Sequence, residues 1–254
     1  MAKQCWGCQP VTAFPRGRMP GSQRRMPMKI VVIGGTGLIG SKLVTKLGEH
    51  GHQAVAASPN AGVNTLTGEG LSDALAGTAL VVDVANSPSF ENAAVMEFFE
   101  TSTRTLLAAS GCFRVKIAQE SPIEKSSIPY SLVHATQFFG FVARIADAAA
   151  EGGAVRLAPV LFQPIAGDDV AQAVGSTAGG SPLNGTVEIA GPEQSRMDEF
   201  FRAAPAARND PREVEPNPHA RYFGTELSER TLVPAGLAIR GEIRNAEWPG
   251  RIRE

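Results

Sequence analysis

The chain has 254 residues, of which 43% are hydrophobic and 19% charged, and its formal net charge is −1 at pH 7. These values are ordinary for a globular protein that buries a sizeable core. A net charge so close to zero creates no overall field to attract nucleic acid or an acidic membrane surface, so the composition favours a small-molecule site. No apolar run approaches the roughly 20 residues that a membrane span needs, so we expect a cytoplasmic location.

The first 27 residues contain five basic residues, four prolines and no acidic residue, and they show almost no apolar periodicity. This composition predicts a disordered leader, although an arginine-rich, acid-free segment is also compatible with a transit peptide. Internal methionines, the last at position 28, are alternative starts, so we leave the leader out of the expected fold. Cys5 and Cys8 form a CxxC pair without a second ligand pair nearby, so no metal site is predicted.

A continuous β-branched run from Lys29 to Ile33 predicts a strand that is buried on both faces of a parallel sheet. Apolar residues at helical spacing follow from Leu38 to His50. Further strands are expected at 53–57, 79–84, 129–134, 155–157, 160–163 and 186–190, and further helices at 66–75, 90–109, 113–125, 138–149 and 168–178. The repeated strand and helix units imply an α/β fold with a doubly wound parallel sheet, of the Rossmann type. Residues after about 208 permit no firm assignment.

A glycine-rich turn lies between the first expected strand and its helix and satisfies both GxGxxG and GxxGxxG. Glycines there allow a sharp bend, a close approach of a pyrophosphate to the main chain, and close packing of the helix on the strand. The backbone amides at the helix N-terminus can then hold the diphosphate. The turn therefore predicts dinucleotide binding by Gly34, Gly35, Thr36, Gly37, Leu38, Ile39 and Gly40.

The choice of cofactor depends on the end of the second strand, where an acidic residue would bind the ribose 2′-hydroxyl of NAD. No acidic residue occurs between Gly51 and Gly68, so NADP is preferred and NAD is the alternative. No Lys or Arg is near enough in the sequence to meet a 2′-phosphate, so Ser58 and Asn60 would supply neutral hydrogen bonds. The other interpretation is that these two residues only shape a turn. Asn86, in the loop after the strand at 79–84, is a further candidate cofactor contact.

Several stretches, taken in their order and spacing, resemble the NmrA-like branch of the atypical short-chain dehydrogenase/reductases. They are residues 28–43, 81–90, 113–120, 128–139, 163–170 and 185–193. The resemblance implies an NADP-binding domain followed by a small portion that faces the substrate. It implies either reductase activity on a small carbonyl or quinone-like substrate or a non-catalytic redox-sensing role. The expected domains are the leader at 1–27, an NAD(P)-binding Rossmann domain at 28–150 and the C-terminal portion at 151–254.

The resemblance also implies a catalytic Tyr with a Lys four residues later and a Ser on the preceding strand, which together handle the proton as hydride moves. Here Lys116 is present and is the candidate catalytic residue, and it is also a candidate contact to the nicotinamide ribose. Cys112 stands where the Tyr would be expected, and neither tyrosine of the chain has a Lys four residues after it. Cys112 is interpreted as a small apolar filler; a proton-donating thiol is the alternative.

A second departure concerns the length of chain between the expected helices at 90–109 and 113–125. Only Ser110, Gly111 and Cys112 separate them, whereas a strand alone needs about five residues. The sheet is therefore expected to lack one central strand. Either a gap remains or the strands at 79–84 and 129–134 pair directly, and marginal stability would follow from the lost burial.

Three functions remain open at this point. The first is an NADPH-dependent oxidoreductase, and the second is a dinucleotide-binding sensor with a degenerate active site. The third is a relic of a once catalytic protein that no longer binds the cofactor. His134 is interpreted as a structural histidine, and Gln137 and Phe138 are weak candidates for cofactor or substrate contact. The sequence indicates neither the substrate nor the oligomeric state.

Overall fold

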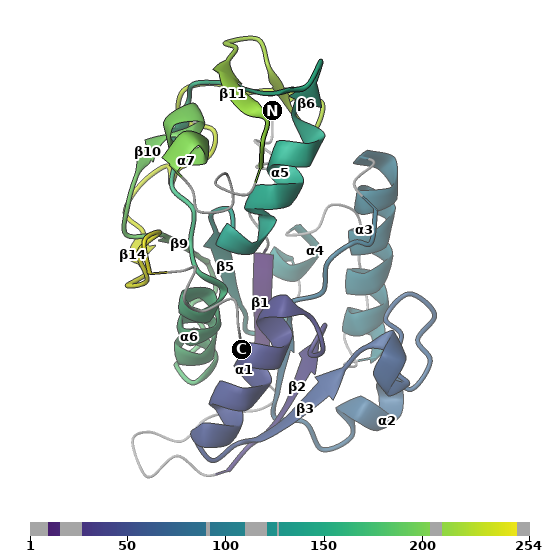
Figure 1. Cartoon of the computed structure of the whole chain (residues 1–254). Coiled ribbons are helices and arrows are strands. Elements are labelled where there is room, and N and C mark those ends of the chain that lie inside the picture. Colours follow the sequence, from purple (N-terminus) through teal and green to yellow (C-terminus); the bar gives the residue numbers. More distant parts are fainter. Residues whose placement is uncertain are drawn as a thin grey trace. The chain divides into compact units, whose positions relative to one another are not determined.

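The computed structural model describes residues 10–15, 27–89, 92–109, 121–125, 127–203 and 210–247 (Figure 1). Its strands are β1 (Pro10–Pro15), β2 (Lys29–Ile33), β3 (Gln53–Ala57), β4 (Leu80–Asp83), β5 (Ser131–Ala135), β6 (Ala150–Glu151), β7 (Ala154–Leu157), β8 (Leu161–Phe162), β9 (Thr186–Ala190), β10 (Ser195–Arg196), β11 (Glu213–Pro216), β12 (Arg221–Tyr222), β13 (Thr225–Glu226) and β14 (Ile239–Arg240). Its α-helices are α1 (Leu38–Glu49), α2 (Leu71–Leu75), α3 (Asn92–Ala109), α4 (Ser121–Glu124), α5 (Val142–Ala148), α6 (Gly167–Ala178) and α7 (Met197–Ala203), and its short 3-10 helices are η1 (Pro59–Ala61) and η2 (Phe139–Phe141).

Strand β2 is the centre of the parallel region, because β3 pairs along one of its edges and β4 along the other. Ile30, Val31 and Val32 have 0% exposure, as expected for β-branched residues buried on both faces of a parallel strand. Side chains of α2 and α3 pack on this region through Leu71 and Leu106. The predicted α/β class with a parallel sheet is therefore confirmed, and so are the strands expected at 29–33, 53–57, 79–84, 129–134 and 186–190.

The main sheet has seven strands in the order β14-β9-β5-β1-β4-β2-β3. Strand β1 runs antiparallel to β4, with Thr12 opposite Asp83 and Pro15 opposite Leu80. The sequence-based expectation of disorder is thus wrong for residues 10–15, and β4 and β5 neither leave a gap nor pair directly. The physical reason is that β4 has an edge that needs hydrogen-bond partners, and a segment from the leader supplies them.

The chain divides into two compact units, which are described separately. Of the described residues, unit 1 comprises those within 134–170 and 188–247, and unit 2 comprises those within 10–133 and 171–187. The domain boundaries at residues 27 and 150 stay predictions.

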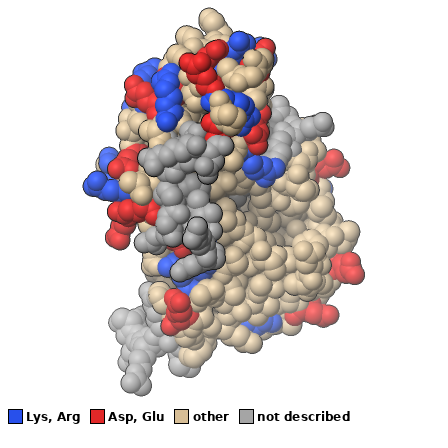
Figure 2. Space-filling view, in the orientation of Figure 1, with Lys and Arg blue, Asp and Glu red and all other residues tan. Residues whose placement is uncertain are grey.

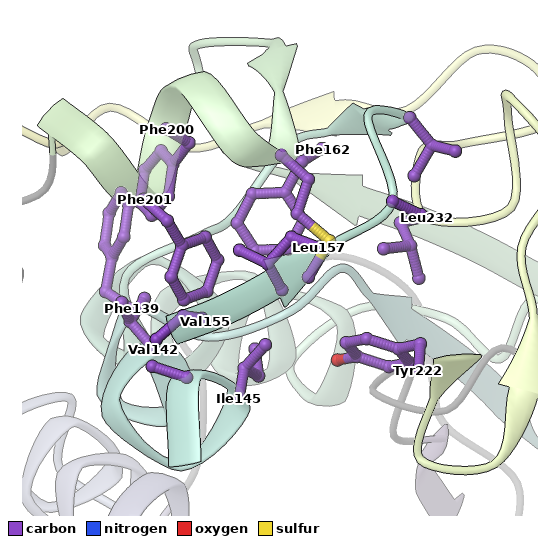
Figure 3. Close-up of a cluster of buried hydrophobic side chains, with 14 of the residues drawn as sticks. Phe139, Val142, Ile145, Val155, Leu157, Phe162, Phe200, Phe201, Tyr222 and Leu232 are labelled. Atoms are coloured by element: carbon purple, nitrogen blue, oxygen red, sulfur yellow. The ribbon is translucent and has the colours of Figure 1, made fainter. Parts of the chain in front are cut away.

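The core of unit 1 is rich in aromatic side chains that come from η2, β8 and α7 (Figure 3). Phe162 has 0% exposure, and its ring lies edge-on to that of Phe200, with 5.1 Å between the ring centroids. Phe200 also stacks on Phe139 at 6.3 Å and meets Phe201 edge-on at 5.7 Å. Aromatic rings bury large areas in these offset and edge-on arrangements, so this cluster gives unit 1 its own hydrophobic centre.

Short elements account for most differences from the expected order. The helix at 138–149 is divided into η2 and α5, and only Ser121–Glu124 of the helix expected at 113–125 falls among the described residues. Helix α7 and the strands β6 and β10 to β14 are not indicated by the sequence pattern. Each of these elements has seven residues or fewer, and periodicity is ambiguous in so short a window.

Acidic and basic side chains lie next to one another on the face shown in Figure 2. This mixture agrees with a net charge of −1 for the whole chain. None of the helices in the described part of the chain combines the length and the apolar character that a membrane span requires.

Candidate functional site

The glycine turn of unit 2 joins the carboxyl end of β2 to the first turn of α1. The backbone N–H of Gly34 donates to the carbonyl of Ala57 at the end of β3 over 2.8 Å. The N–H of Gly37 donates back to the carbonyl of Gly34 over 2.9 Å, which closes the turn. Gly34 has a φ of +75°, a conformation that residues with a Cβ atom rarely adopt. The turn is thus held together by main-chain bonds.

Three of the four glycines are required by the fold itself. A Cβ atom on Gly40 would lie 2.1 Å from the carbonyl oxygen of Gly34, and one on Gly35 would lie 2.6 Å from Cα of Ala56. A Cβ atom on Gly34 would lie 2.8 Å from the backbone of Ala85. Gly37 differs, because it is exposed, its φ is −80°, and its Cβ would meet only the Gly34 carbonyl at 3.2 Å. The absence of a side chain at Gly37 therefore keeps space open on the outer face of the turn.

Helix α1 begins directly at this space. Its first residue is Leu38, its N-cap Gly37 makes no side-chain capping bond, and its first turn holds no acidic residue. The first N–H groups of a helix have no partner within the helix, and the helix dipole adds positive potential there. The backbone amides of Leu38, Ile39 and Gly40 can consequently donate to an anion that approaches the turn. The side chain of Thr36, also in the turn, is exposed to solvent.

Ser58 is the first residue after β3. It directly follows Ala57, whose carbonyl accepts the N–H of Gly34 in the glycine turn. Its carbonyl accepts the N–H groups of Ala61 and Val63, both at 2.9 Å, and Ser58 therefore does shape the turn around η1. Its hydroxyl is buried and has no hydrogen-bond partner among the described residues. Asn60 is exposed. The backbone of Ser58 thus has a structural task while its hydroxyl remains available to a ligand.

Asp83 ends β4 opposite Ile33 of β2 and was not anticipated as a site residue. Its Oδ1 accepts the N–H of Ala85 over 2.9 Å, and burial raises the pKa of this carboxyl to about 6 despite that bond. The sequence feature that could have indicated Asp83 is its position as an acidic residue at the end of an apolar strand. Asn86, the candidate cofactor contact in the following loop, is exposed.

In unit 1, the loop after β5 carries a buried polar network. The Thr136 hydroxyl donates to the carbonyl of Gln163 over 2.5 Å, and Nε2 of Gln163 donates to the carbonyl of Gly191 over 2.7 Å. Gln137 is 1% exposed, and neither polar atom of its side chain has a partner among the described residues. Phe138 is buried beside Phe141, with 5.8 Å between ring centroids. Gln137 is therefore the one residue of this loop whose buried polar atoms stay available.

Unit 1 also contains an open cavity of about 340 Å³. Aromatic and acidic residues line it together with an amide whose buried Oδ1 has no partner. The lining residues are Phe139, Pro164, Glu193, Ser195, Glu199, Phe200, Ala203 and Asn245. Sequence reasoning missed this cavity because its walls come from elements that the sequence did not indicate, above all α7.

The predicted catalytic residue Lys116, also a candidate cofactor contact, lies outside the described residues, as does Cys112. His134 lies half-buried within β5 and has at least one interaction. The described candidate residues therefore form two groups that are considered separately. Unit 2 holds the glycine turn with Ser58, Asp83 and Asn86, and unit 1 holds the loop after β5 and the cavity.

No protein-family model and no curated protein sequence matches the chain. Solved structures do. A dTDP-4-dehydrorhamnose reductase from Bacillus anthracis, in complex with NADP, superposes with a TM-score of 0.58 at 12% identity, covering 82% of this chain and 91% of that one. A UDP-N-acetylglucosamine 4-epimerase from Bacillus cereus gives 0.55 at 15% identity, with 84% and 88% covered. A Thermus thermophilus UDP-glucose 4-epimerase in complex with NAD gives 0.51 at 15% identity, with 88% and 93% covered.

Identities of 12 to 15% establish a shared fold and no more. The similarity nevertheless extends over most of each chain. The chain has the Rossmann-like α/β fold of these nucleotide-sugar reductases and epimerases.

Proposed function

We propose that the chain binds a nicotinamide dinucleotide at the turn Gly34–Gly40 and acts as an NADPH-dependent oxidoreductase on a small carbonyl or quinone-like substrate. Two of the solved structures that share its fold contain NADP or NAD, which supports a cofactor of this class. The resemblance to the NmrA-like branch supports the hypothesis of a reductase that acts on a small carbonyl or quinone-like substrate.

The observation that carries the proposal is the difference between Gly37 and its three neighbouring glycines. Gly34, Gly35 and Gly40 are explained by contacts within the protein, whereas Gly37 is exposed and has an ordinary φ. A side chain at Gly37 would stand beside the amides of the first turn of α1, and it would meet the protein only at the Gly34 carbonyl, at 3.2 Å. An anion bound to those amides explains why a small residue is useful there.

The preference for NADPH is supported by the end of β3. The buried, unpartnered hydroxyl of Ser58 can donate to a phosphate oxygen, and no carboxylate from Gly51 to Gly68 would repel that phosphate. Asn60 can add a second neutral bond, and Asn86 remains a candidate contact from the loop after β4. NAD is the alternative cofactor because the sequence has no Lys or Arg between Leu47 and Thr103 that could meet a 2′-phosphate.

The bound dinucleotide would supply the hydride, and the residues of this chain would hold the cofactor and the substrate. Lys116 is the proposed contact to the nicotinamide ribose. Gln137 offers a buried amide that can satisfy polar groups of a ligand. The 340 Å³ cavity of unit 1 has the size of a small-molecule site, and its carboxylates and the Asn245 oxygen suit a substrate with hydroxyl or amine donors.

The proposal is tested by calorimetric titration of the full chain with NADPH and with NADH. We expect saturable binding, tighter for NADPH, that weakens at least about tenfold in Gly37→Ala and disappears in Gly37→Asp. Gly48→Ala is the matched control, because Gly48 lies exposed in the same helix and its Cβ would contact nothing within 4 Å. Binding that is equal in Gly37→Asp and Gly48→Ala, with both proteins folded, would remove the turn as the site.

A dinucleotide-binding sensor is the second candidate function. The specific observation that favours it is Cys112 at the position where the resemblance implies a catalytic Tyr. A sensor would bind NADPH without consuming it. NADPH oxidation should therefore be followed with a panel of small carbonyls and quinones, and turnover with any of them, abolished by Gly37→Asp, supports the enzyme over the sensor.

A further inference from the structure

Strand β1 occupies an unusual place for a segment that precedes the first βα unit. It lies between β4 and β5 in the main sheet, whereas the chain itself connects β4 to β5 through α3 and α4 (Figure 1). Its register with β4 covers four residue pairs, from Thr12 opposite Asp83 to Pro15 opposite Leu80. Because β2 pairs along the other edge of β4, the β1 segment makes β4 an interior strand.

The need for a strand at this position follows from burial. Val81 and Val82 of β4 are 2% and 0% exposed, so the peptide groups of this strand are shielded from water. Buried N–H and C=O groups without partners cost free energy comparable to lost hydrogen bonds. Among the described residues, the chain between α3, which ends at Ala109, and α4, which begins at Ser121, contributes no strand at this position. Without β1, one edge of β4 would therefore lack partners.

The direction of β1 agrees with its origin in the leader. A parallel neighbour needs a crossover of a dozen or more residues, usually with a helix, whereas an antiparallel strand can arrive by a loop. Pro15 lies opposite Leu80 at the start of β4, and the N–H of Ala79 donates to the Lys29 carbonyl at the start of β2 over 2.9 Å. The end of β1 and the start of β2 thus lie at the same edge of the sheet, about 10 Å apart by two strand spacings. Residues 16–28 are long enough to join them.

The sequence of the segment also suits a strand with partners on both sides. Val11, Thr12, Ala13 and Phe14 keep their N–H groups, and Pro10 and Pro15 stand at the two ends, where the missing donors matter least. Val, Thr and Phe are common in strands.

We propose that the opening between β4 and β5 is a binding site for an extended peptide strand, that residues 10–15 are its occupant, and that the same segment binds there when it is supplied as a separate peptide. The ligand is recognised mainly by main-chain hydrogen bonds antiparallel to β4. This site is separate from the proposed dinucleotide site and would exist whether or not the chain is an enzyme.

The first test is cross-linking in the full chain after Cys5, Cys8 and Cys112 are replaced by Ser. Facing residues of antiparallel strands have Cα atoms about 4.5–5.5 Å apart, within the range of a disulfide. We expect Ala13→Cys to cross-link with Val82→Cys, or Phe14→Cys with Val81→Cys, since adjacent pairs alternate in geometry. Ala13→Cys with Gln53→Cys on the distant β3 is the control and should not react. A bond between two chains would show the same occupant arriving from a second copy. No bond in either facing pair of a folded protein overturns the proposal.

The second test uses a weakened strand in the full chain. Ala13→Pro removes an N–H from the middle of β1, and we expect its Tm to fall by at least about 6 °C. Ala2→Pro, outside the strand, is the control. A peptide of residues 9–16 should raise the Tm of Ala13→Pro in a saturable manner, whereas a scrambled peptide should not. Equal Tm values for the two proline variants, or an equal effect of the two peptides, contradict the proposal. If Ala13→Pro does not fold, the cross-linking result decides.

Discussion

The glycine turn of unit 2 and the loop after β5 in unit 1 each follow a buried strand, but they present polar groups in opposite ways. The turn exposes backbone amides of Leu38 and its neighbours, and the fold needs nothing from the side chains there except their absence. The loop buries the amide of Gln137 without a partner, and the Thr136 hydroxyl of the loop donates to Gln163, a buried residue after β8 whose amide is bonded to the Gly191 carbonyl. A main-chain site thus costs the fold little, whereas a side-chain site places a polar group where it lowers stability until a ligand satisfies it.

The largest expected effect is at the turn. Gly40→Ala would place Cβ 2.1 Å from the Gly34 carbonyl oxygen, which is backbone and cannot move aside cheaply. We expect the unfolding free energy to fall by about 3 kcal/mol or more. Chemical denaturation monitored by circular dichroism measures this change, with Gly48→Ala as the variant that should not lose stability. A Gly40→Ala protein as stable as Gly48→Ala would show that the turn tolerates side chains.

The second prediction compares the same substitution at two buried glutamines of unit 1. Gln163→Leu removes the donor to the buried Gly191 carbonyl, so it should cost about 1–3 kcal/mol of stability. Gln137→Leu removes a buried amide without partners, so it should leave stability unchanged or raise it by about 1 kcal/mol. If Gln137 contacts a ligand, the same variant weakens NADPH binding or turnover. Equal losses of stability in both variants would mean that the Gln137 amide is satisfied after all.

The third prediction concerns the pH dependence of stability. Because burial raises the pKa of Asp83 to about 6 in the folded state, from 3.8 for the unperturbed group, the folded protein holds this proton more tightly than the unfolded chain. Its stabilising contribution is fully present below about pH 4 and is lost as the pH rises through about 6. Asp83→Asn should therefore gain stability relative to the unmodified chain between pH 4 and pH 7, by about 1–2 kcal/mol. Urea unfolding at a series of pH values measures this, and a difference that does not vary with pH would contradict it.

The smallest expected effect is at the end of β3. Ser58→Ala removes a buried hydroxyl without a partner, so stability should change by less than about 0.5 kcal/mol. NADPH affinity should nevertheless fall severalfold, by the loss of about one hydrogen bond, while NADH affinity changes little. Titrations of both cofactors test this, and an unchanged ratio of the two affinities would leave Ser58 with only its structural task.

Long apolar runs made the parallel region predictable from sequence. Val31 in β2 and Val82 in β4 lie in continuous apolar stretches, which predict buried strands, and both residues are 0% exposed. The glycines between β2 and α1 predict a tight turn. Residues 10–15 could not be predicted as a strand, because their role depends on an unpaired edge formed by residues far along the chain. For the same reason, the raised pKa of Asp83 and the unpartnered amide of Gln137 could not be predicted, since burial and hydrogen-bond partners depend on the assembled core and not on local sequence.

The position of β1 has a consequence for how the protein is made. Residues 10–15 leave the ribosome before almost all of the chain, yet β4 and β5, their neighbours in the sheet, are synthesised much later. At about 5–20 residues per second, the nascent segment waits several seconds for its site to exist. Contacts between such distant parts of the sequence also slow folding, because a long loop must close before they form. We therefore expect β1 to pair with β4 and β5 late in folding, after β2, β3 and α1 have packed together.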